Sequence, residues 1–346
     1  MSNLNLMVVG VGALGRHHAR ILSGLENVTL AAVADPREEI GQSIARQFET
    51  RWVADFRDAI DDVDAASIVV PTSLHVPVAR EFLTRGIPVL VEKPLAGTDD
   101  DARLLTQLAI DHDCVLQVGH VERFNPAYIA AKERIGQPRL IRTERFSPFP
   151  FRSMDIGVVH DLLIHDIDLV LDLVKSEVVD VQAFGVSAMS HFEDVVNARL
   201  TFANGCIADL TANRINPTAC RRMQMWSNSG RVDVDLQSRV VEHFSPSNEL
   251  RSDASPVELA CQPGADIEQL KSEVFGRFIE LQTPDISADD ALTAELSEFT
   301  DCVRTGSRPS CSGFEALDAL EVAEQIREKM TCAQWGSNLQ KQSRAA

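Results

Sequence analysis

The chain has 346 residues, which is enough for two domains that each bury a core of their own. With 45% apolar and 24% charged residues, its composition is that of a globular protein and excludes a largely disordered chain. The formal net charge of −18 at pH 7 argues against nucleic acid or an anionic membrane as a partner.

Residues 1–121 are predicted to form one dinucleotide-binding domain in which strands and helices alternate. No apolar run reaches the roughly 18 to 20 residues of a membrane helix, and the first run leads into glycines, so we interpret it as a strand and not a signal peptide. The predicted strands are nearly continuous in Val, Ile and Leu, and amphipathic segments separate them, which is typical of a doubly wound parallel sheet. These strands cover residues 4–11, 28–35, 51–54, 66–71, 87–93 and 114–120.

Residues 122–332 show a different pattern of apolar and polar residues and are predicted to form a substrate and oligomerisation domain of the α+β class. Helices are expected at 125–135, 154–174, 291–306 and 315–330. Between residues 178 and 245, alternating apolar and polar residues with closely spaced turns predict a mainly antiparallel, open sheet. The pattern fades at 251–290, which we interpret as an excursion with some helix, and residues 333–346 are predicted to be a frayed tail.

A glycine-rich turn separates the first predicted strand from the first helix. Gly10 permits a tight turn, Gly12 lets the backbone approach a pyrophosphate, and Gly15 lets the helix pack close to the strand. The start of the helix adds backbone donors and a partial positive charge. We therefore predict that these glycines, together with Ala13 and Leu14, bind a dinucleotide.

An aspartate ends the second predicted strand. Asp35 is placed to hydrogen-bond the adenosine ribose hydroxyls, which favours NAD. Arg37 leaves NADP open as an alternative, since a nearby arginine can accept a 2′-phosphate.

Two polar segments follow later strands of the same domain, where ligands bind in such sheets. Thr72, Ser73 and His75 follow the strand at 66–71 and are expected near the cofactor, although Thr72 or Ser73 also suits a helix N-cap. Glu92 and Lys93 follow the strand at 87–93, and the next residue, Pro94, is consistent with a cis peptide bond. We predict cofactor contacts for both and a proton-handling role for Lys93; the alternative is a surface lysine beside a turn.

The predicted helix at 154–174 carries Asp161 and His165, four residues apart and therefore on one face, with Asp168 one turn further. We predict that His165 acts on the substrate proton and that Asp161 orients it or contacts the substrate, although a buried core histidine is the commoner reading of such a pattern. The ligand-type side chains of this helix point around its whole circumference, so no metal is expected.

The segment VGHVERFNP at 118–126 joins the two predicted domains. Arg123 and Asn125 are candidates for lining a substrate cleft, and interdomain packing is the equally weighted alternative. Arg152 belongs to a group of arginines in the middle of the chain that suggests an anionic small ligand.

GVGALG at 10–15, Asp35, PTSLH at 71–75, EKP at 92–94 and the pair of Asp161 and His165, in this order, resemble the glucose-fructose oxidoreductase / inositol dehydrogenase / rhizopine catabolism (Gfo/Idh/MocA) family. The resemblance extends from Leu6 to about Met330. It implies NAD(P)-dependent oxidation or reduction of a sugar or cyclitol, with Lys93 and His165 serving catalysis and Asp161 contacting the substrate. It also implies that the open sheet makes a homodimer or homotetramer.

Within the family, VGHVERFNPA and DLLIHDIDLV are most similar to the branch that oxidises the 3-hydroxyl of UDP-N-acetylglucosamine. The usual glycine-rich run before the Asp-xxx-His pair is replaced by SMDIGVVHD. The alternatives are an inositol or free-sugar dehydrogenase and, from another class, a non-catalytic NAD-binding regulatory protein. Seven scattered cysteines without a CxxC pair favour reduced thiols in a cytoplasm and argue against zinc or a disulfide framework.

Overall fold

The computed structural model describes residues 3–151, 156–252 and 255–335. The chain forms two compact units, called unit 1 and unit 2 below. Unit 1 combines Met1–Phe124 with Asp289–Glu321, and unit 2 combines Asn125–Ala288 with Val322–Ala346. The stretch 289–321 thus groups with the first unit, although it was predicted to belong to the domain at 122–332.

Unit 1 is built on a six-stranded sheet with the order β3-β2-β1-β4-β5-β6, and all its neighbouring strands run parallel. All residues of β4, β5 and β6 are buried, as expected for a parallel sheet covered on both faces. This confirms the predicted doubly wound Rossmann sheet. The strands are β1 (Leu4–Val9), β2 (Val28–Ala34), β3 (Arg51–Val53), β4 (Ala65–Ile68), β5 (Val89–Glu92) and β6 (Leu116–Gly119).

The helices of unit 1 begin and end at local signals. Thr98 caps α4 by accepting the N–H of Asp101, and three aspartates in its first turn favour the positive end of the helix. α10 begins at the cap Asp290 and ends before Gly306, whose φ is +69°. The helices are α1 (Gly15–Leu22), α2 (Glu38–Gln47), α3 (His75–Leu83), α4 (Asp99–Asp111), α10 (Ala291–Thr305) and the first part of α11 (Gly313–Lys329).

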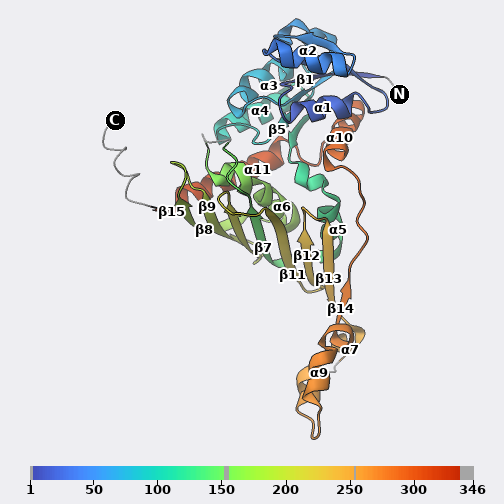
Figure 1. Ribbon diagram of the computed structural model, residues 1–346, viewed down its shortest axis with the longest axis vertical. Coiled ribbons are helices and arrows are strands. Elements are labelled where there is room, and N and C mark those ends of the chain that lie inside the picture. The colour runs from blue at the N-terminus through green and yellow to red at the C-terminus, as the bar shows by residue number, and fades with distance from the viewer. Residues whose placement is uncertain (1–2, 152–155, 253–254, 336–346) are drawn as a thin grey trace. The chain divides into compact units, whose positions relative to one another are not determined.

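The return of the chain to unit 1 is driven by apolar packing. Leu296 and Phe299 of α10 are fully buried in the hydrophobic cluster that also contains Leu22 of α1. Figure 1 shows α10 beside α1. In the described part of the chain, no helix is both long and apolar enough to cross a membrane.

Unit 2 is built on a nine-stranded sheet with the order β14-β13-β12-β11-β7-β10-β9-β8-β15. β10 pairs parallel to β7 and β15 pairs parallel to β8, and the other neighbours are antiparallel, which confirms the predicted mainly antiparallel sheet. The strands are β7 (Pro138–Phe146), β8 (Val178–Ser187), β9 (Val195–Phe202), β10 (Ile207–Asn213), β11 (Cys220–Ser227), β12 (Gly230–Asp235), β13 (Val240–Pro246), β14 (Ile279–Gln282) and β15 (Met330–Gln334).

The end of the chain differs from the expected frayed tail. Residues 330–334 form β15, which pairs with residues 183–187 of β8, so the tail predicted from 333 begins inside a strand. This pairing joins segments far apart in sequence, which alternation within one segment does not reveal. Residues 336–346 lie outside the described residues.

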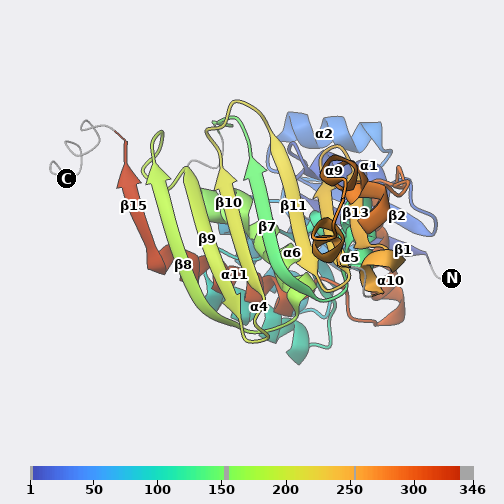
Figure 2. The ribbon, with the colours of Figure 1, turned by 90° about the horizontal axis from the view of Figure 1, so that it is seen from below.

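One face of this sheet is covered by helices. Every second residue of β10 is buried, and α5 (Pro126–Ile135) and α6 (Ile164–Val174) pack on that side. Figure 2 shows the strands in front of α5 and α6. The opposite face carries cross-strand ion pairs, including Arg199 with Asp209 and Arg222 with Asp235. Alternation therefore separates a helix-covered face from a polar face.

A helical excursion leaves the sheet after β13, and Figure 1 shows it beyond β14. It contains α7 (Asn248–Arg251), α8 (Pro256–Ala260) and α9 (Ile267–Glu273), and none of these helices has a buried residue. The weak apolar pattern of 251–290 reflects this exposure.

Candidate active site

The glycine-rich turn of unit 1 is held against the strand ends around it. Gly10 has a φ of +88°, and a Cβ at this position would lie 2.4 Å from the carbonyl oxygen of Val69. A Cβ at Gly15 would lie 1.8 Å from the carbonyl oxygen of Gly10. Only glycine fits at these two positions, because a side chain would collide with backbone atoms.

The start of α1 is arranged to receive an anion. A Cβ at Gly12 would meet its nearest neighbour, Nη2 of Arg37, only at 3.5 Å, so this side of the turn is open. Ala13 and Leu14 are exposed, and Leu14, the N-cap of α1, makes no capping bond through its side chain. Backbone N–H groups at such an uncapped helix start bind phosphate oxygens. The predicted turn therefore fits the pyrophosphate of a dinucleotide.

Asp35 lies at the end of β2 with only 2% of its surface exposed. Its Oδ2 accepts the backbone N–H of Val11 at 3.0 Å and Nη2 of Arg37 at 2.8 Å, and its Oδ1 accepts Nε of Arg37 at 2.9 Å. Burial alone would raise the pKa of Asp35, but the hydrogen bonds from Arg37 and Val11 outweigh burial and lower it. The carboxylate is therefore ionised at neutral pH beside the glycine turn.

The segment after β4 is organised by His75. Nδ1 of His75 lies 2.9 Å from the carbonyl oxygen of Pro94, and Nε2 lies 2.9 Å from that of Val70. Burial lowers the pKa of His75, and the two carbonyl contacts oppose this effect. Thr72 and Ser73 form a short 3-10 turn before α3. The N-caps of this turn and of α3 are Pro71 and Leu74, so neither Thr72 nor Ser73 fills the helix N-cap that was the alternative interpretation.

The segment Glu92-Lys93-Pro94 ends β5, and its Lys93–Pro94 peptide bond is cis. The Glu92 carboxylate lies 3.2 Å from Nε2 of the fully buried His18 and accepts the backbone N–H of Lys93 at 3.2 Å. Nδ1 of His18 lies 2.8 Å from the hydroxyl of Ser67 in β4. The side chain of Lys93 is half-buried.

His18 and His75 thus contact the residues on either side of Lys93. This arrangement was not predicted, because His18 and His75 lie on helices α1 and α3 and not in the segment at 92–94. The glycine turn, Asp35 with Arg37, His75 and the segment at 92–94 all lie at the carboxyl ends of parallel strands, as predicted.

The two predicted residues of unit 2 lie on a helix that begins as a π-helix. Val159–Leu163 form the π-helix, which contains Asp161, and α6 follows at once with His165 in its first turn. Asp161 is buried and His165 is half-buried. The sequence predicted one α-helix from residue 154, so it missed the wider turn at Asp161. Single π-turns of this kind are frequent at functional sites.

Other polar residues of this helix have separate structural partners. Asp166 pairs with Arg145 of β7 at 2.8 Å, and both side chains are almost fully buried. Nε2 of His160 lies 3.0 Å from the carboxylate of Glu324. Burial lowers the pKa of His160, although the Glu324 carboxylate acts to raise it. Asp168 is fully buried.

The two residues of the connecting segment that were predicted to contact substrate make hydrogen bonds within their own units. Arg123 is buried in unit 1, and its Nη1 donates to the carbonyl oxygen of Ser310 at 2.9 Å. Asn125 caps α5 by accepting the N–H of Ala127, and its Nδ2 donates to the carbonyl oxygen of Leu236 at 3.0 Å. Each of these hydrogen bonds lies within one unit, so neither one shows packing between the units, and the substrate role of both residues stays a prediction. Arg152 lies outside the described residues.

Comparison with known proteins finds one family model for part of each unit. Residues 4–120 match a family model described as an oxidoreductase family with an NAD-binding Rossmann fold, and residues 128–233 match the GFO/IDH/MocA C-terminal domain. The UDP-N-acetylglucosamine 3-dehydrogenase of Acidithiobacillus ferrooxidans is 32% identical over 94% of this chain and 97% of that protein. The chain belongs to the GFO/IDH/MocA family.

Further members of the family match at lower identity. The scyllo-inositol 2-dehydrogenase (NAD(+)) of Bacillus subtilis is 26% identical over 91% of this chain and 90% of that protein. A solved structure of the Acidithiobacillus ferrooxidans enzyme superposes with a TM-score of 0.82 at 30% identity, covering 95% of this chain and 98% of that one.

Membership of the GFO/IDH/MocA family identifies the chain as an oxidoreductase and its first unit as an NAD-binding Rossmann domain. The glycine turn and Asp35 are the features of this chain that fit that cofactor. The predicted family, fold, enzyme class and cofactor are therefore confirmed.

Proposed function

We propose that this chain is an NAD-dependent dehydrogenase that oxidises the 3-hydroxyl of a UDP-N-acetyl sugar. The observation that supports this substrate is the 32% identity to a UDP-N-acetylglucosamine 3-dehydrogenase along 94% of the chain. An inositol or free sugar is the second candidate, because inositol dehydrogenases match at 26% identity over similar lengths.

In the proposed reaction, His165 removes the proton of the sugar hydroxyl as a general base. Lys93 donates a hydrogen bond to the same oxygen and stabilises the negative charge that develops on it. Asp161, buried in the π-turn before His165, orients the imidazole or the sugar. Bound NAD supplies the hydride acceptor. Lys93 and His165 are both present in this chain, which speaks against the non-catalytic alternative.

A turnover screen tests the substrate. The chain is incubated with NAD and, separately, UDP-N-acetylglucosamine, N-acetylglucosamine and myo-inositol, and reduced cofactor is followed by absorbance. We expect kcat/KM for the UDP-sugar to exceed that for either uncharged compound by about 10²-fold or more, because charge-assisted contacts to the diphosphate contribute binding energy. Equal values for the UDP-sugar and inositol contradict the proposed substrate.

We further propose that the chain is a cytoplasmic homodimer or homotetramer that associates through the open face of the unit 2 sheet. This face presents Phe184, Trp226 and Phe244 among its ion pairs, and Phe184 is 50% exposed. Aromatic residues among arginines are typical of protein interfaces.

Sedimentation velocity at micromolar concentration is expected to give a dimer or a larger species. Phe184→Asp should shift the chain toward monomer by placing a charge in the interface. Val257→Asp, on the exposed helix α8 and 70% exposed, is the matched control and should leave the assembly unchanged. A wild-type monomer contradicts the proposal.

A further inference from the structure

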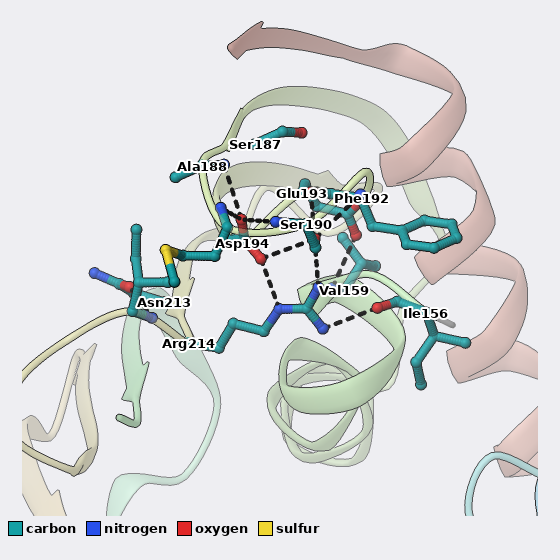
Figure 3. A network of polar contacts seen from close by, with 12 residues as sticks. Ile156, Val159, Ser187, Ala188, Ser190, Phe192, Glu193, Asp194, Asn213 and Arg214 are labelled. Atoms are coloured by element: carbon teal, nitrogen blue, oxygen red, sulfur yellow. Dashed lines mark hydrogen bonds and ion pairs between the residues drawn. The ribbon is translucent and has the colours of Figure 1, made fainter. Parts of the chain in front are cut away.

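The loop between β8 and β9 contacts the residues that precede the π-helix (Figure 3). In this loop, Asp194 has no exposed surface, and its carboxylate accepts backbone N–H groups from Ala188 at 2.8 Å and Met189 at 2.7 Å. Nε of Arg214 donates to the same carboxylate at 2.9 Å, and Arg214 is 1% exposed. Breaking such a pair leaves a buried charge without its partner.

Arg214 extends from this pair to the backbone before the π-helix. Its Nη1 donates to the carbonyl oxygen of Ile156 at 2.8 Å, and its Nη2 donates to the hydroxyl of Ser190 at 2.9 Å. One guanidinium therefore links Ile156 to the loop between β8 and β9, and its planar shape allows all three contacts together.

Glu193 of the same loop holds the next residues. Its carbonyl oxygen accepts the N–H of Val158 at 2.9 Å, and its Oε1 accepts the N–H of Val159 at 3.2 Å. A Cβ at Gly157 would lie 1.8 Å from Oε1 of Glu193, so the carboxylate occupies the space that a side chain at Gly157 would need. The carbonyl of Gly157 in turn accepts the N–H of Asp161 at 3.1 Å.

The structure assigns Glu193, supported by the buried Arg214–Asp194 pair, as a positioning residue that sets the π-turn and thereby the places of Asp161 and His165. Glu193 contacts the backbone of Val158 and Val159 and acts only through the helix that follows them. This inference rests on the proposed function, because the π-turn affects turnover only if Asp161 and His165 serve the reaction.

The test compares Glu193→Ala with Glu193→Gln. Glu193→Ala removes the acceptor for Val159, and misplacement of reacting groups by about 1 Å can cost up to 10²-fold, so kcat with UDP-N-acetylglucosamine should fall about tenfold or more. Glu193→Gln keeps an oxygen acceptor of the same reach and should stay within about threefold of wild type. The Kd for NAD should not change in either variant.

Asp172→Ala is the matched control, because it removes a carboxylate at the other end of the same helix, where Asp172 accepts Lys132 and Tyr128. It should leave kcat unchanged. Gly157→Ala is a second route to the same effect, because the added Cβ displaces the Glu193 carboxylate, and it should lower kcat like Glu193→Ala.

Combined substitutions distinguish loss of positioning from a general loss of structure. If Glu193 acts through the helix, adding Glu193→Ala to a chain that already carries Asp161→Ala and His165→Ala should lower the residual kcat by less than about threefold, because coupled residues are not additive. A full second loss overturns the inference. Should His165→Ala itself leave kcat unchanged, the proposed function fails instead.

Hydrogen–deuterium exchange tests the anchoring without turnover. The amides of 158–161 should exchange faster in Glu193→Ala than in wild type, because Val159 loses its acceptor, and Asp172→Ala should not show this. Unchanged exchange at these amides overturns the inference whatever the substrate proves to be.

Discussion

Lys93→Met and His165→Ala are each expected to lower kcat by about 10²-fold or more, the usual contribution of a positioned acid–base group. Met keeps most of the length of the lysine but cannot donate to the alkoxide oxygen, and Ala removes the proposed base. The Kd for NAD, measured by fluorescence titration, should change little, because neither side chain is expected to bind the adenosine half.

His243→Ala is the matched histidine control. His243 lies in β13 and is half-buried, with a pKa lowered by its burial and by Arg134, and it has no proposed role in the reaction. It should retain wild-type kcat. A His165→Ala variant with unchanged kcat would show that the base has been assigned to the wrong residue.

NAD is expected to bind at least tenfold more tightly than NADP, a difference of about 1.4 kcal/mol. The physical reason is that Asp35 is buried, has a lowered pKa and holds both Nε and Nη2 of Arg37. A 2′-phosphate would meet this ionised carboxylate, while the guanidinium that could bind the phosphate is already paired.

Asp35→Ser should weaken the binding of NAD and strengthen the binding of NADP until the preference for NAD disappears or reverses, because the substitution frees Arg37 for the 2′-phosphate. Arg37→Ala in the Asp35→Ser background should abolish the gain for NADP. Asp55→Asn is the surface control, since Asp55 pairs with Arg57 in the same unit and both side chains are about half exposed. If wild type binds NADP tenfold more tightly, the assignment of Asp35 is refuted and Arg37 becomes the determinant.

The positions predicted correctly are those whose signal lies within a short stretch of sequence. The glycine turn, Asp35 and the segment at 92–94 each follow a strand that apolar runs reveal, and parallel strands bring their ends to one edge. The family motifs added Asp161 and His165, which lie in adjoining turns of one helical stretch.

The features that were missed depend on contacts between distant segments. The π-turn at 159–163 is held by Glu193 from another loop, and no periodicity of its own sequence distinguishes it from an α-turn. Arg214 also belongs to the arginine-rich middle of the chain, which suggested an anionic ligand, but its side chain is buried against Asp194. Arg123 and Asn125 were ambiguous for the same reason, because their partners Ser310 and Leu236 lie far along the chain.

The return of α10 to unit 1 has a consequence for biosynthesis. The first sheet is complete once residues 1–124 have left the ribosome, but the core of unit 1 still lacks Leu296 and Phe299, which are fully buried in it. Domains generally fold as units during synthesis, N-terminal first. Part of the apolar core of unit 1 therefore stays uncovered until α10 has been synthesised, and apolar surface that is exposed in this way during folding favours aggregation.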